Sequence, residues 1–140
     1  MTVAVVTNYE WAVTPERVEE MQRRIVAEAD PLKIIAFGSR ARGDHREDSD
    51  LDIVVVLDAP QEQVHRKLPY TVLEGLCMPV DMIAVSKAEY DDLRPWLNSV
   101  FNYADHEGVV LYDREHPELA SPQALHTGGR RGIGTTLSAA

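Results

Sequence analysis

Apolar residues along most of the chain fall either at helical spacing or in short unbroken runs typical of strands. Val18, Met21 and Ile25 recur at helical spacing while polar residues occupy the other faces, which predicts an amphipathic helix over residues 15–29. Thr14 is the expected N-cap of this helix and Pro15 its first residue, and Asp30-Pro31 is expected to end it.

The short apolar runs predict strands, and the remaining periodic stretches predict further helices. The predicted strands cover residues 33–37, 51–57, 78–85 and 109–112. The further predicted helices cover residues 61–76, with a kink at Pro69, 87–93 and 95–106. The run from Ile53 to Leu57 does not alternate with polar residues, which is typical of a central strand covered on both faces.

The periodic pattern covers residues 15–112, which we expect to form one domain. Residues 1–14 are a short apolar segment without a clear partner, and we expect an N-terminal arm there. From residue 113 onward Gly, Ser, Thr and Pro replace the periodic apolar positions. Residues 113–140 are therefore expected to form a flexible C-terminal tail.

The composition of the 140 residues narrows the classes of function. A hydrophobic content of 44% and a charged content of 26% are those of a soluble globular protein. The longest apolar run is too short to span a membrane, and the N-terminus has no secretory signal pattern, so we expect a cytoplasmic protein. A net charge of −9 argues against an extensive nucleic-acid surface.

One basic spot interrupts this acidic chain. Arg40, Arg42 and Arg46 lie within seven residues of one another, and Lys33 is nearby. A small positive spot on an acidic body suits a nucleoside triphosphate better than a long polynucleotide.

Two aspartates flank an apolar residue at the start of a predicted strand. Because alternate residues of a strand share a face, Asp50 and Asp52 point to one side while Leu51 points into the protein. Two carboxylates at this spacing can bridge a pair of divalent cations roughly 3.5–4 Å apart, the arrangement used for in-line displacement at phosphorus. The upstream turn at Gly38 and Ser39 supplies backbone amides and a hydroxyl to hold phosphate oxygens. These residues predict a nucleotidyl-transfer site.

A third acid, Asp81, lies in the otherwise apolar stretch PVDMIAV. Burial of this carboxylate without a partner would be costly, so a cation or a hydrogen-bond donor would have to meet it. No Lys or Arg lies inside the strands that carry the three acids, which favours bound Mg²⁺. The alternative is that Asp81 occupies an exposed edge-strand position or has a backbone-amide partner.

The segment GSRARGDHREDSDLDIVVV resembles the signature of the nucleotidyltransferase superfamily that includes DNA polymerase beta and kanamycin nucleotidyltransferase. It resembles more closely the small bacterial proteins called minimal nucleotidyltransferases, over roughly residues 15–112. The resemblance implies an α+β fold with a small mixed β-sheet flanked by helices, like the palm of polymerase beta.

The resemblance also implies roles for individual residues. The catalytic and metal-binding residues would be Asp50, Asp52 and Asp81, and the nucleotide-binding residues would be Gly38, Ser39, Arg40 and Arg42. Which of the two arginines touches the phosphates is left open. Two Mg²⁺ ions, with Mn²⁺ as an alternative, would assist transfer of a nucleoside monophosphate from ATP to a hydroxyl group, with release of pyrophosphate.

The acceptor is the least determined part of this hypothesis. Larger relatives append a helical domain that presents the acceptor, and here the predicted fold runs out near Tyr112. In minimal nucleotidyltransferases the usual partner is a HEPN-type helical toxin, and AMP is in some systems attached to a toxin tyrosine. We therefore expect an adenylyltransferase that acts as the antitoxin of such a pair. The alternatives are a transferase for an aminoglycoside-like small molecule, working as a homo-oligomer, and a non-catalytic nucleotide-binding antitoxin that masks its partner.

Overall fold

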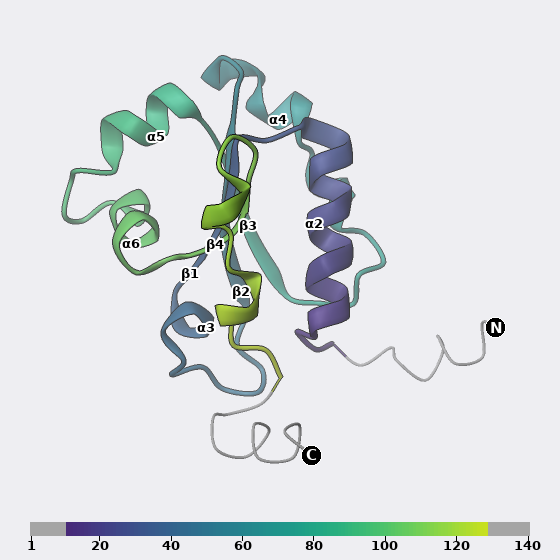
Figure 1. Cartoon of the computed structure of the whole chain (residues 1–140). Helices are drawn as coiled ribbons and strands as arrows, with labels where there is room; N and C mark the ends of the chain where they lie inside the picture. The colour runs from purple at the N-terminus through teal and green to yellow at the C-terminus, as the bar shows by residue number, and fades with distance from the viewer. Residues whose placement is uncertain (1–10, 129–140) are drawn as a thin grey trace.

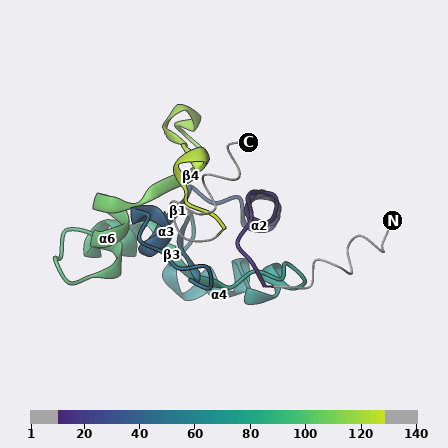
Figure 2. The same cartoon turned by 90° about the horizontal axis from the view of Figure 1, so that it is seen from below.

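The computed structural model describes residues 11–128, which form a four-stranded sheet with helices on both faces (Figures 1 and 2). In chain order the helices and strands are α2 (Pro15–Ala29), β1 (Lys33–Phe37), α3 (Ser39–Arg42), β2 (Leu51–Leu57), α4 (Val64–Lys67), β3 (Val80–Ser86), α5 (Lys87–Leu93), α6 (Val100–Glu107) and β4 (Val109–Asp113). The 3-10 turns are η1 (Gln61–Gln63), η2 (Tyr70–Leu73), η3 (Pro117–Leu119) and η4 (Pro122–Ala124). No helix in this part of the chain is long and apolar enough to cross a membrane.

The sheet is mixed and has the strand order β3-β2-β1-β4. β1 is antiparallel to both of its neighbours, whereas β2 and β3 run parallel. Because parallel neighbours need a crossover, η1, α4 and η2 connect these two strands. β2 is an inner strand, and its residues from Ile53 to Leu57 are all buried, as the unbroken apolar run predicted. The predicted α+β fold class is confirmed.

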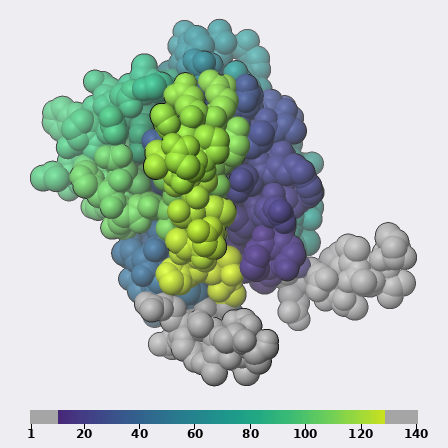
Figure 3. All heavy atoms as spheres, viewed as in Figure 1, coloured from purple at the N-terminus to yellow at the C-terminus, as the bar shows by residue number. Residues whose placement is uncertain are grey.

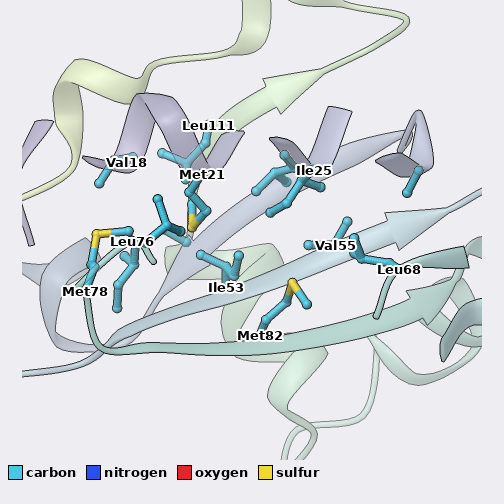
Figure 4. Close-up of a cluster of buried hydrophobic side chains, with 14 of the residues drawn as sticks. Val18, Met21, Ile25, Ile53, Val55, Leu68, Leu76, Met78, Met82 and Leu111 are labelled. Atoms are coloured by element: carbon cyan, nitrogen blue, oxygen red, sulfur yellow. The ribbon is translucent and has the colours of Figure 1, made fainter. Parts of the chain in front are cut away.

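α2 packs its apolar stripe against one face of the sheet and has the predicted bounds. Thr14 Oγ1 accepts a hydrogen bond from the Arg17 amide at 3.2 Å, and Asp30 ends the helix in a left-handed conformation. Figure 4 shows the side chains of this core meeting between helix and sheet. Its buried members include Val18, Met21, Ile25, Ile53, Val55, Leu68, Leu76, Met78, Met82 and Leu111.

α5 and α6 cover the opposite face and form a second apolar cluster with β1 and β2. The predicted cap of α5 is present, since Ser86 Oγ accepts a hydrogen bond from the Glu89 amide at 3.1 Å. α6 begins at Val100 rather than near residue 95, because Ser99 Oγ accepts from the amides of Phe101 and Asn102 at 3.0 and 3.1 Å.

Residues 61–76 do not form the single kinked helix that their apolar spacing predicted. Pro69 has an extended backbone and precedes η2, and the positive φ angles of Gly75 (81°) and Cys77 (54°) turn the chain toward β3. The apolar residues of the segment still reach the core, because Val64 and Leu68 are buried there together with Leu76.

Residues 114–128 pack against the domain, so the expected flexible tail is wrong for this part of the chain. Leu125 is 8% exposed and belongs to the core under α2. The Ser121 amide donates to the Val110 carbonyl at 2.7 Å, and the Gly128 amide donates to the Val13 carbonyl at 2.8 Å. In Figure 3 the segment, in yellow-green, forms a ridge between α2 and the helices of the other face. The rest of the predicted tail (129–140) and most of the predicted arm (1–10) lie outside the described residues.

A chain that ends after Glu118 should melt at least about 5 °C below a chain that ends after Gly128. The shorter chain lacks the buried Leu125 side chain and the hydrogen bonds to Val110 and Val13. Thermal melts followed by circular dichroism measure the difference. The chain ending at Gly128 is the control because it keeps every contact described above, and equal melting temperatures would show that the segment adds no stability.

Candidate active site

The turn after β1 approaches the start of β2 closely. Gly38 has φ 79° and ψ −155°, a conformation that favours glycine. A Cβ atom at this position would lie 2.8 Å from Asp52 Oδ2. The amides of Ala41 and Arg42 donate to the Gly38 carbonyl, both at 3.0 Å, whereas the first amides of such a turn have no acceptor within it. The turn therefore presents backbone donors beside a carboxylate.

Two of the predicted acids meet through strand pairing. Because β1 is antiparallel to β2 and β2 is parallel to β3, the end of β1 and the starts of β2 and β3 lie at the same end of the sheet. Asp52 is paired with Phe37 on one side and with Asp81 on the other. Residues paired across neighbouring strands share a face of the sheet, so both carboxylates lie on the side covered by α5 and α6.

The electrostatics of Asp52 bring the third acid into the same group. The pKa of the Asp52 carboxyl lies above its ordinary value because burial removes water from it and because the charges of Asp81 and Asp50 repel the ionised form. The positive charge of Arg42 acts in the opposite direction, and its effect is smaller. The charges of Asp50 and Asp81 therefore both lie close enough to Asp52 to affect its pKa.

The carboxylates suit a divalent cation, although no three His, Cys, Asp or Glu side chains among residues 11–128 converge as metal ligands do. Ionised carboxylate oxygens are the ligands that Mg²⁺ takes in proteins. Burial and, after it, the charges of Asp81 and Asp50 raise the pKa of Asp52, and a cation between the acids would relieve the repulsion. The space beside Asp52 Oδ2 also stays open only because residue 38 has no side chain.

The premise that Asp81 is buried is wrong. β3 is the edge strand of the sheet, and Asp81 is exposed there, as the alternative interpretation of this residue allowed. The cost of burying an acid falls instead on the half-buried Asp52 of the inner strand. Sequence alone did not separate the two positions, because both acids lie in apolar runs.

The two candidate arginines have different surroundings. Arg40 is completely buried, and its guanidinium donates to backbone carbonyls in its described hydrogen bonds, so these contacts occupy it away from a bound phosphate. Arg42 is exposed, and its charge reaches Asp52. Of the two, Arg42 is therefore the better candidate for a phosphate contact.

Glu107 is a residue near the site that sequence reasoning missed. Its carboxylate accepts a hydrogen bond from Arg42 Nη1 at 2.8 Å, and Asp44 accepts one from Arg42 Nε at 3.2 Å. These contacts raise the pKa of Arg42 and connect α3 to the end of α6. No local pattern indicates these contacts, because Glu107 lies 65 residues away from Arg42 along the chain.

The predicted basic spot is smaller than expected. Lys33 does not belong to it, since this residue lies at the other end of β1, 3.9 Å from Asp113 Oδ2.

The profile of the family described as nucleotidyltransferase domain matches residues 18–107, a range that includes every candidate site residue. The chain belongs to this family. Membership confirms the resemblance to nucleotidyltransferases and supports transfer of a nucleotidyl group as the activity.

The fold of this nucleotidyltransferase domain is also that of a solved structure. The crystal structure of a protein from Sulfolobus solfataricus, described as a presumed nucleotidyltransferase, superimposes with a TM-score of 0.51 at 22% sequence identity. The match covers 74% of this chain and 83% of that chain. At this identity the likeness concerns the fold alone. No curated protein matches the sequence.

Gly38→Ala should reduce binding of ATP with Mg²⁺ far more than Gly75→Ala does. Both glycines have a positive φ, 79° and 81°, so both substitutions place alanine in a backbone conformation that L side chains rarely adopt. Only at Gly38 would the new Cβ collide with Asp52, because nothing lies within 4 Å of a Cβ at Gly75. Calorimetric titration and thermal melts of both variants measure the difference, and equal losses of affinity would contradict the importance of this close approach.

Asp52→Asn should raise the melting temperature in metal-free buffer at neutral pH while abolishing binding of ATP with Mg²⁺. A carboxyl whose pKa is higher in the folded than in the unfolded state binds its proton more tightly when folded, so stability falls as pH rises through the raised pKa. The gain from Asn should therefore be full at neutral pH and disappear below the ordinary carboxyl pKa. Melts of both proteins from about pH 3 to about pH 8 follow this change. An Asn variant that is less stable than the unmodified protein at neutral pH would contradict the raised pKa of Asp52.

Proposed function

We propose that this protein transfers AMP from ATP to a hydroxyl group, with Mg²⁺ or Mn²⁺ bound by Asp50, Asp52 and Asp81. The observation that supports this proposal most is the pairing of Asp52 with Asp81 beside the turn at Gly38, where the missing side chain leaves room next to Asp52 Oδ2. It combines carboxylates for a cation with backbone donors for phosphate in one place.

The residues of the turn would bind the triphosphate. Backbone amides at the start of α3 and the half-buried Ser39 hydroxyl can donate to phosphate oxygens. Arg42 can add a positive charge from the exposed side of the same turn, provided that Glu107 and Asp44 release part of its guanidinium. A triphosphate bound in this way would have its α-phosphorus directed toward the acids, and orientation of this kind accounts for much of the rate of phosphoryl-type transfer.

The three acids would have different tasks. Asp52 would hold the ion most rigidly, because it is half-buried and paired with residues of both neighbouring strands. Asp50 and Asp81 are exposed and would bind the ion from the solvent side. A divalent ion bound there would neutralise charge on the phosphates and lower the pKa of the acceptor hydroxyl. Asp81 is exposed, so its carboxylate can accept the proton of an acceptor that arrives from solvent.

A protein side chain is the acceptor that the surroundings favour. Trp96 (67% exposed), Leu97 (79%) and Tyr103 (48%) are large apolar side chains on α6 and the loop before it. Tyr103 lies one helical turn from Glu107, whose contact with Arg42 joins α6 to the site. These side chains are available to contact a partner protein. Together with the resemblance to minimal nucleotidyltransferases, they support a tyrosine of a HEPN-type helical toxin as acceptor, which would make this protein an antitoxin.

The test is incubation with labelled ATP, Mg²⁺ and the protein encoded by the adjacent gene. That neighbour should be labelled on Tyr, Ser or Thr, and the label should vanish with Asp50→Ala or Asp52→Ala because the cation site is lost. Asp58→Ala is the matched control, since this exposed acid follows the opposite end of β2.

Each other outcome selects a different function. Labelling of an aminoglycoside-like small alcohol in place of the neighbour would overturn the protein acceptor and support a small-molecule transferase. Neutralisation of the neighbour without any label, unchanged by Asp52→Ala, would overturn the catalytic proposal and support an antitoxin that masks its partner by contact.

A further inference from the structure

Arg40 makes an unusual set of contacts for a residue in a phosphate-binding motif. Its side chain is completely buried in α3, immediately after the turn at Gly38 and Ser39. The guanidinium donates to five backbone carbonyls, which we call the carbonyl cage. They belong to Ser49 (3.0 Å from Nε), His126 and Gly128 (3.2 and 3.0 Å from Nη1), and Arg46 and Glu47 (3.4 and 3.2 Å from Nη2).

The carbonyl cage joins two segments that are far apart in the sequence. One is the loop that leads to Asp50, where the Ser49 hydroxyl also accepts from the Arg46 amide at 2.7 Å. The other is the C-terminal segment, whose His126 amide donates back to the Arg40 carbonyl at 3.0 Å. In Figure 1 the described part of this segment, in yellow, runs down toward the end of the molecule that carries α3. Arg40 is thus bonded to the C-terminal segment through both its side chain and its backbone.

The C-terminal segment is itself anchored on the side away from Arg40. The Leu125 side chain is buried in the core under α2, and the Gly128 amide bonds to Val13 just before that helix. A displacement of Leu125 would therefore move two of the five carbonyls of the cage. The remaining three carbonyls belong to the loop that carries Asp50.

Only arginine has the donor geometry for this cage. Its planar fork directs five N–H groups outward, whereas the three donors of a lysine ammonium spread from one atom. Burial lowers the pKa of Arg40, and the nearby charges of Asp48 and Asp50 counteract that effect. Asp48 and Asp50 therefore also help to keep the buried Arg40 guanidinium protonated.

We propose that Arg40 is a positioning residue, which ties the C-terminal segment to the loop before Asp50 and so fixes this acid relative to Asp52 and the phosphate turn. The structural part of the inference stands on the contacts alone, and its effect on cation binding rests on the function proposed above. In this role the C-terminal segment controls the site without contributing a side chain to it.

The test compares Arg40→Lys and Leu125→Ala with Ile25→Val, a core substitution in α2, in the full chain. Hydrogen exchange measured by mass spectrometry should show faster exchange at residues 45–50 in both test variants, including Leu125→Ala, which touches no residue of that loop in its described hydrogen bonds. Arg40→Lys should likewise speed exchange at residues 126–128. Ile25→Val should leave both segments unchanged relative to the rest of the chain.

The affinity for Mn²⁺ in the presence of a non-hydrolysable ATP analogue provides the second measurement. Both test variants should weaken it about tenfold, as loss of a partner behind a ligand typically does, and Ile25→Val should not. Unchanged exchange at 45–50 in Leu125→Ala would overturn the tie between the segments. Altered exchange with unchanged affinity would overturn the positioning role. If the unmodified chain binds no Mn²⁺ with nucleotide, the proposed function fails, while the exchange data still decide whether the two segments are coupled.

Discussion

The pairing of β2 with β3, which sets two carboxylates side by side, is the constraint on which the rest of this site depends. The parallel register of β2 and β3 sets Asp52 opposite Asp81. That register is fixed by apolar burial, because Ile53 and Val55 fill one core while Val54 and Val56 fill the other. A shift of one residue would turn Asp52 from the side of α5 and α6 toward the apolar core under α2, which would bury its charge there and disfavours such a slip. The apolar core therefore holds in place a group of like charges that is unfavourable by itself, and this is expected of a site built to receive a cation.

Two residues near the three acids keep the site open and ordered. On one side, the missing side chain of Gly38 leaves room next to Asp52 Oδ2. On the other, the loop before Asp50 is held by the buried guanidinium of Arg40. Because Arg40 is also bonded to the carbonyls of His126 and Gly128, the order of the loop depends on the far end of the described chain. Precision at a site of this kind comes from the groups behind the ligands as much as from the ligands.

The sequence indicated local structure and missed long-range structure. The bounds of α2 follow from its cap and its stop, and the burial of β2 follows from its apolar run, because both signals lie within a few residues. Asp52 and Asp81 lie side by side because strand periodicity and strand order act together. The packing of Leu125 had no such signal, since a single apolar residue among Gly, Ser and Pro has no period. The direction of the Arg40 side chain could not be predicted either, because its acceptors are carbonyls up to 88 residues away and carbonyls occur at every position.

The measurement that tests the central claim most directly is a pH titration of the Asp52 carboxyl carbon by NMR, first without metal and then with Mg²⁺. The account predicts a pKa above the ordinary aspartate value without metal, because of burial and the charges of Asp81 and Asp50. It also predicts that Mg²⁺ lowers this pKa, since a cation favours the ionised form. An ordinary pKa without metal, or a pKa that does not respond to Mg²⁺, would contradict the claim that these three acids form a cation site.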